Sequence, residues 1–196
     1  MNQRVVTNVL WNEATGKIKT FFIGGNMLSA SYYRALAARM GMFENVEVVY
    51  SPNMTQASAE YVSSSINLGG TITDSNKMYL KFLEADSVPR KALIIHESTH
   101  AVSDMLRMNM TKAESEMMAY IAQCQYAVAS RHPGRLQSES NDSKQQAVLD
   151  IAWDIAEAMQ KGATPTTADY TKLYNAVCQH PYYAKNPQSK AVYDGI

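Results

Sequence analysis

The first half of the chain alternates between strand-like and helix-like patterns. Residues 17–23 (KIKTFFI) predict a strand, and the Gly-Gly-Asn run that follows is expected to end it. Residues 29–40 predict a helix with Gly41 as its C-terminal stop. Residues 46–50 form a short β-rich run before a Ser-Pro pair. This half is therefore expected to mix both kinds of element.

The stretch between residues 53 and 82 is less regular. Residues 53–65 are ambiguous, and a short helix followed by a loop is our interpretation of them. Residues 71–73 and 78–82 are either separate strands or the two arms of a hairpin.

The second half of the chain is almost entirely helical in pattern. We expect a helix from residue 88, capped by Asp86 or Ser87, with Pro89 tolerated in its first turn. Strands first and helices later predict an α+β domain, with a small sheet in the N-terminal half packed on helices. The predicted helices cover residues 88–108, 112–131, 143–161 and 168–179.

Composition narrows the classes of function. The 196 residues suffice for one domain with a hydrophobic core, and we expect a single domain over 1–196. Apolar residues make up 46% and charged residues 18%, which is typical of globular proteins. The formal net charge of zero gives no indication of a nucleic-acid or membrane partner, and no apolar run is long enough to span a bilayer.

The start of the chain and the cysteines indicate the cellular compartment in which the protein is expected. The first residues lack the apolar core of a signal peptide. Cys124 and Cys178 lie in unrelated contexts, so we expect two unpaired thiols that are not metal ligands. A cytoplasmic location is therefore expected, and export by a route without a cleavable signal is the alternative.

The pattern His96-Glu97-Ser98-Thr99-His100 lies inside the helix predicted from residue 88. Residues four apart in a helix lie one above the other, so His96 and His100 project two imidazoles from one face. Two such nitrogens can bind one tetrahedral zinc ion at about 2.0–2.1 Å each. Glu97 lies about 100° round the helix from His96, beside the metal, where it can take a proton from water. The pattern predicts a hydrolytic Zn²⁺ site with Glu97 as its general base.

A catalytic zinc site takes three protein ligands and keeps one position open. Ser103 and Leu106 occupy the positions where metzincins carry Gly and His, so that continuation is absent. The third ligand should then be an acid on the next helix, which offers Glu114 and Glu116 near its start.

Local chemistry separates these two acids. Thr111 and Glu114 match a capping box, which is a sufficient structural role for Glu114. Glu116 has no such role and lies beside an apolar stripe of the same helix, where an acid needs a partner. Both residues stay open as the third ligand, and Glu116 is favoured.

The sequence HESTHAVSDML followed by KAESEMMAYIAQC resembles the zincin metallopeptidases of the gluzincin kind. In that family a Glu on the next helix follows H-E-x-x-H, often as E-x-x-A-[YD], and Glu116-Met117-Met118-Ala119-Tyr120 matches this form. Thermolysin-like members carry an Asp where this chain has Tyr120, so any role of that Asp in supporting the metal ligands is altered or lost. The resemblance covers residues 88–127. It implies a zincin-like fold, in which the edge strand of a small twisted sheet lies over the cleft and the active-site and ligand helices follow.

Further residues are candidates for orienting the imidazoles or for binding the substrate. Asp104, one turn beyond His100, either orients an imidazole or is an ordinary solvated helix residue. A substrate carbonyl oxygen usually needs a further hydrogen-bond donor in such sites. The candidates for that donor are His180, Tyr182, Tyr183 and Tyr120.

The function expected from these features is zinc-dependent hydrolysis of peptide bonds in a peptide or protein substrate. An extended peptide would bind by adding a strand to the edge of the sheet. The first alternative is a zincin-fold binding or regulatory module that holds zinc without cutting. The second is a metal-free domain in which the motif is accidental. Glu97 favours the enzyme, because a zinc site without catalysis does not need it.

Overall fold

The computed structural model describes residues 2–43, 46–55, 57–66, 72–138, 142–193 and 195. The chain begins with α1 (Asn2–Leu10) and α2 (Glu13–Gly16), two helices for which the sequence pattern gave no prediction. Val6, Val9 and Leu10 are buried, at the spacing of an amphipathic helix that packs one face on the core.

The predicted helix over 29–40 is α3 (Ala30–Phe43), which continues through Gly41. Gly41 was expected to end it. A glycine stops a helix most readily when its φ is positive, and Gly41 is not among the residues with positive φ. It therefore stays in the helical conformation, and the predicted stop is wrong.

The strand predicted over 17–23 is confined to β1 (Phe21–Ile23), which pairs antiparallel with β2 (Asn26–Leu28). Gly24 and Gly25 join them with φ values of 56° and 82°. Positive φ at both central residues is the requirement of a type I′ hairpin turn, which glycine meets without steric cost.

The other sheet has the order β3 (Glu47–Tyr50), β5 (Ile72–Leu80), β4 (Ala59–Ile66) in the described residues. β3 runs parallel to β5, whereas β4 runs antiparallel to it, so β4 is an edge strand. The interpretation of 53–65 as a short helix and a loop is wrong. The Ser63-Ser64-Ser65 run hides any apolar alternation, and pairing with β5 makes the segment a strand.

The two short strands predicted at 71–73 and 78–82 are parts of the single strand β5, except that Thr71 lies outside the described residues and residues 81–82 follow the strand. Neither alternative is therefore right: the two runs are not separate strands, and they are not the two arms of a hairpin, because β5 pairs antiparallel with β4 instead.

The four helices of the second half are confirmed as α4 (Val88–Met105), α5 (Lys112–Ala129), α6 (Ser143–Gln160) and α7 (Thr167–Gln179). α4 and α5 end earlier than predicted because an arginine adopts the left-handed conformation after each of them, Arg107 with φ 50° and Arg131 with φ 56°. After α4, Arg107 N–H donates to Asp104 O at 2.8 Å and Met108 N–H donates to Ser103 O at 2.9 Å, which is the Schellman pattern. Arginine takes the place that glycine usually fills, so the sequence carried no stop signal.

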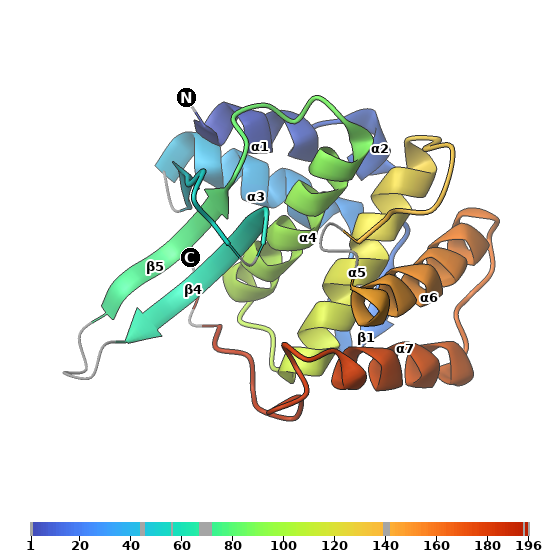
Figure 1. Ribbon diagram of the computed structural model, residues 1–196. Helices are drawn as coiled ribbons and strands as arrows, with labels where there is room; N and C mark the ends of the chain where they lie inside the picture. The colour runs from blue at the N-terminus through green and yellow to red at the C-terminus, as the bar shows by residue number, and fades with distance from the viewer. Residues whose placement is uncertain are drawn as a thin grey trace.

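α4 lies in the middle of the molecule, with β4 on one side and α5 on the other (Figure 1). Its fully buried apolar side chains include Ala92, Ile94, Ile95, Ala101 and Val102. The fold is mixed α+β, as predicted, and it places the helix that carries both histidines between the sheet and the helical half. No helix in the described part of the chain is long and apolar enough to cross a membrane.

Candidate metal centre

α4 holds His96 and His100 at the centre of the fold. Ser87 caps the helix by accepting a hydrogen bond from Arg90 N–H, so of the two predicted caps Ser87 is the one used. The ring centroids of the two histidines lie 5.2 Å apart, one turn from each other on one face. His96 is 7% exposed, which places its imidazole in a largely dry environment.

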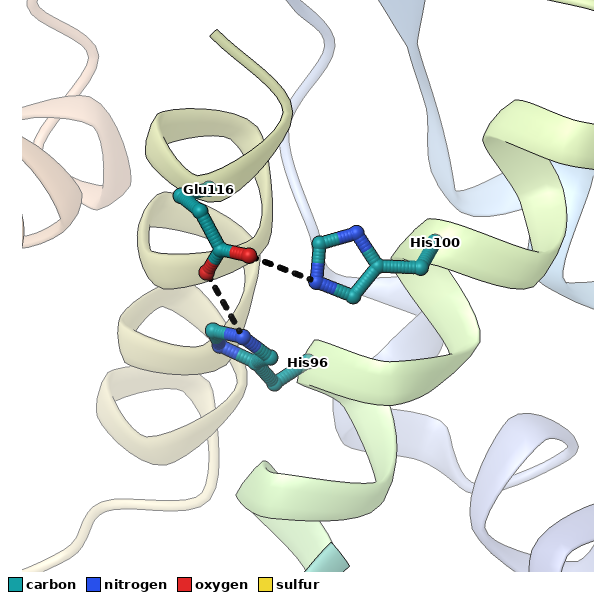
Figure 2. Close-up of side chains that lie close together, drawn as sticks. All are labelled: His96, His100 and Glu116. Carbon is teal, nitrogen blue, oxygen red and sulfur yellow. Dashed lines mark ion pairs between the residues drawn. The ribbon is translucent and has the colours of Figure 1, made fainter. Parts of the chain in front are cut away.

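Glu116 on α5 faces both imidazoles (Figure 2). One of its carboxylate oxygens lies 3.4 Å from His96 Nε2 and the other lies 3.5 Å from His100 Nε2. The ligand-type atoms of His96, His100 and Glu116 all lie within 4.8 Å of one another. The structure thus brings together the three residues that the sequence predicted as metal ligands.

Glu114, the other candidate ligand, has a structural role at the start of α5. Its carboxylate accepts a hydrogen bond from Thr111 N–H at 2.7 Å, while Thr111 Oγ1 accepts one from Glu114 N–H at 3.2 Å. This reciprocal pair is the predicted capping box at the start of α5. Glu114 therefore stabilises the helix end that positions Glu116.

The second nitrogen of each imidazole has its own partner. His96 Nδ1 lies 3.0 Å from Gln123 Oε1, and His100 Nδ1 lies 2.9 Å from Ser115 Oγ and 3.2 Å from the Tyr193 hydroxyl. An amide oxygen only accepts, so Nδ1 of His96 carries a proton, and Nε2 is the nitrogen that faces Glu116. Metal-binding histidines show this arrangement, in which an outer partner fixes the tautomer and the ring orientation.

The pKa values of Glu116 and of the two imidazoles are shifted in different directions. Burial raises the pKa of Glu116, but the His100 and His96 imidazoles outweigh it, and the pKa is lowered overall. Burial lowers the pKa of His100 to about 4, which keeps this imidazole neutral near pH 7. Burial acts to lower the pKa of His96, but the hydrogen bond to Glu116 and the charges of Glu97 and Glu116 outweigh it, so this pKa is raised overall. Zinc binds a carboxylate anion and neutral imidazole nitrogens, so the donor set fits zinc once the metal displaces a proton from His96.

No family model, curated protein or solved structure matches this chain. The site is therefore interpreted from its own geometry.

Glu97 lies beside the three candidate ligands without belonging to their group. It is 7% exposed, and its Oε2 accepts a hydrogen bond of 2.8 Å from the backbone N–H of Tyr61 on β4. Burial raises the pKa of Glu97 to about 7, although the His96 imidazole and the Tyr61 N–H both act to lower it. A carboxylate with a pKa in this range can both accept and release a proton near neutral pH.

A cleft of about 370 Å³ opens over the site. One wall is formed by residues 57–61, which lead into and begin the edge strand β4. The opposite side is lined by the helical half, including Leu136, Gln145 and Leu149. All three ligands and Glu97 reach this cleft, so a substrate entering it would meet them directly.

The four candidate donors all line the cleft, but their surroundings differ. The Tyr183 hydroxyl donates to Glu116 Oε2 at 2.8 Å, and the Tyr120 ring packs edge-on against His96. His180 accepts the Tyr182 N–H at Nδ1, and its Nε2 lies 3.6 Å from an Asp142 carboxylate oxygen, so both ring nitrogens have protein partners.

Asp104 takes neither of its two expected roles. It is fully buried, so it is no solvated surface residue. Its carboxylate accepts hydrogen bonds from the Tyr61 hydroxyl at 2.7 Å and from Gly195 N–H at 2.8 Å. The Nδ1 atoms of the two imidazoles are hydrogen-bonded to Gln123, Ser115 and Tyr193 instead.

The outer partners of the imidazoles were missed by the sequence analysis. Gln123 had a signal, because it lies two helical turns after Glu116 on the same face of α5. Tyr193 had none, since it is 93 residues from His100 and lies in an irregular segment.

The cysteines lie away from the metal ligands. Both are free thiols, Cys124 buried and Cys178 partly buried. Burial raises the pKa of the Cys124 thiol, and its sulfur lies 3.8 Å from the Leu149 carbonyl oxygen. Cys124 therefore serves as a small core residue.

Proposed function

We propose that this chain is a zinc-dependent peptidase, with His96, His100 and Glu116 as zinc ligands and Glu97 as general base. The observation that carries the proposal is the convergence of two imidazole Nε2 atoms and one carboxylate inside a cleft. Each Nδ1 is at the same time held by an outer partner. A chance pair of histidines on a helix has no reason to meet both conditions.

Zinc bound there would supply a Lewis acid that polarises a carbonyl oxygen and lowers the pKa of water towards about 7. Glu97 accepts a proton from the attacking water at its carboxylate. The water oxygen adds to the peptide carbonyl carbon, the C–N bond breaks, and Glu97 passes the proton to the departing nitrogen. The Tyr61 N–H holds one Glu97 oxygen and leaves the other oxygen for this transfer.

The substrate class is an extended peptide, because an edge strand borders the cleft. Alternate residues of an antiparallel strand direct their main-chain groups to the same side, so Ala59 shares the outer edge of β4 with Tyr61. Tyr61 N–H already serves Glu97, so the peptide would pair at Ala59. An edge strand followed by the active-site and ligand helices supports a zincin-like fold.

Tyr183 is our choice among the candidate donors for the reacting carbonyl oxygen. Its hydroxyl lies against the ligand Glu116, and burial raises its pKa well above the ordinary value, so it stays protonated. His180 is less suitable because both its ring nitrogens have partners. The two free thiols support a reducing compartment, and we place the enzyme in the cytoplasm.

The test is metal analysis followed by peptide cleavage. Purified protein should carry zinc in a one-to-one ratio and should cut members of a peptide library, and a chelator should abolish cleavage until zinc is restored. Protein that holds no zinc after incubation with it would overturn the proposal.

A second candidate function is a zinc-holding binding module that does not cut. The hydrogen bond from the Tyr61 N–H favours it, because this bond acts to lower the pKa of Glu97 and so weakens the carboxylate as a base. Zinc-loaded protein that retains library peptides without cleaving any of them would select this candidate.

A further inference from the structure

The segment after α7 runs back past the start of α5 towards α4 and β4 (Figure 1). It runs along the start of α5, where Lys112 N–H donates to Ser189 O at 2.8 Å and Ala191 N–H donates to Met110 O at 3.0 Å. These main-chain hydrogen bonds act like a short strand pairing and fix the course of the segment.

Two further anchors hold the segment beyond this point. Ser63 on β4 donates its hydroxyl to Val192 O at 2.6 Å. Gly195 N–H donates to the buried carboxylate of Asp104, one turn after His100 on α4. The segment is thus attached to the edge strand and to the histidine helix at the same time.

Tyr193 lies between these two anchors and reaches the metal site. Its hydroxyl is 3.2 Å from His100 Nδ1 and is also hydrogen-bonded to Ser115 Oγ. His100 directs Nε2 towards Glu116, and with zinc bound at Nε2 the proton of the neutral ring would lie on Nδ1. The hydroxyl oxygens of Tyr193 and Ser115 are then the acceptors that fix this tautomer and the orientation of the ring.

We propose that Tyr193 is a positioning residue of the metal site and that residues 187–193, together with Gly195, form a clamp whose docking is coupled to metal binding. The proposal rests on the zinc site proposed above. Docking of the clamp places an acceptor at His100 Nδ1, which orients Nε2 for the metal. Coupling between two binding events is reciprocal, so metal binding must stabilise the docked clamp by the same factor.

A segment with a purely structural role would behave differently. It would stay docked to the same extent with and without metal, because its main-chain hydrogen bonds to α5 do not involve the ligands. The amide of Ala191, which is hydrogen-bonded to Met110 O, is a direct reporter of docking.

The experiment measures zinc affinity by competition with a chromogenic chelator, and hydrogen exchange of the clamp with and without zinc. Tyr193→Phe removes only the hydroxyl that reaches His100. Tyr170→Phe is the matched control, since it removes a hydroxyl from a partly buried tyrosine of α7 outside the site. Ser63→Ala loosens the clamp at an anchor that touches no metal ligand.

We expect Tyr193→Phe to lose about 10-fold in zinc affinity, the lower end of the effect of such partners, because Ser115 remains. Ser63→Ala should lose less, in the same direction, and Tyr170→Phe should match the wild type. Zinc should slow exchange of the Ala191 amide in the wild type, and less so in Tyr193→Phe.

Three results would contradict the proposal, and each would overturn a different part of it. Equal zinc affinity for Tyr193→Phe and Tyr170→Phe in a zinc-binding protein overturns the positioning role. Clamp exchange that does not respond to zinc overturns the coupling. A wild-type protein that binds no zinc overturns the proposed function, and the clamp with it.

Discussion

The two histidines of the proposed metal site are held by different parts of the molecule. His96 is fixed within the α4–α5 pair, because its Nδ1 partner Gln123 is a largely buried residue of α5. His100 shares its Nδ1 between Ser115 of α5 and Tyr193 of the distant clamp segment. One side of the site therefore depends on the packing of two helices, whereas the other also depends on docking of a segment.

We therefore expect the His96 side of the site to be rigid and the His100 side to be more mobile. Helices that pack over long buried faces hold their side chains with little freedom, so the His96 side should be formed whenever the domain is folded. A segment held by a few hydrogen bonds can open without global unfolding. Changes in the site should therefore appear first on the His100 side.

The largest effect is expected from removing the ligand that both histidines face. Glu116→Gln leaves a neutral side chain between two imidazoles, so we expect loss of zinc on mild dialysis and loss of activity with it. Glu114→Gln is the matched control, because Gln also serves in a capping box, and it should retain zinc. Zinc content after dialysis at equal pH and protein concentration checks both. A zinc-free Glu114→Gln variant would reverse the assignment.

The second largest effect is expected at Glu97, the proposed general base, which lies on α4 with the two histidines. Glu97→Gln should keep its zinc and lose turnover by about 10²–10⁴-fold, the usual contribution of a general base. The same protein preparation should be assayed for zinc content and for peptide cleavage. A variant with equal zinc and near-normal activity would rule out Glu97 as the base.

The meeting of His96, His100 and Glu116 was predictable from the sequence because it follows from the patterns of two helices. Four-residue spacing places His96 above His100, and the capping box accounts for Glu114 and leaves Glu116 for the metal. Helix α4 was predicted with its start correct and its end too late, since Arg107 takes a left-handed conformation that usually belongs to glycine.

The groups around the ligands were not predictable for a physical reason. Strand β4, which supplies the Tyr61 N–H to Glu97, has no apolar alternation of its own and exists through pairing with β5. Tyr193 reaches His100 only after the whole chain has folded. Contacts of this kind are set by tertiary packing, and no local pattern encodes them.

The third prediction compares the two sides of the site directly. Gln123→Leu removes the amide acceptor of His96 and should weaken zinc binding by about 10–100-fold, as loss of an outer partner does. Ser115→Ala should cost less, because the Tyr193 hydroxyl still lies 3.2 Å from His100 Nδ1 and can accept its proton. Chelator competition gives both dissociation constants. Equal losses in the two variants would mean that the clamp adds nothing to the His100 side.

The smallest effect is expected at the capping box, which supports the ligand helix without touching the metal. Thr111→Ala removes the hydroxyl that accepts from Glu114 N–H, and loss of a cap costs about 0.5–2 kcal/mol of stability. The other half of the box survives, because Glu114 still accepts from the backbone N–H of residue 111, so the cost should lie in the lower part of that range. Glu116 lies beyond the capped turn and faces the imidazoles, so its contribution to zinc binding should be preserved. Urea unfolding of the zinc-free protein measures the loss of stability, and chelator competition measures the affinity. A loss of zinc affinity above about 10-fold, the size expected for an outer partner of a ligand, would show that the cap belongs to the metal site and not to the helix alone.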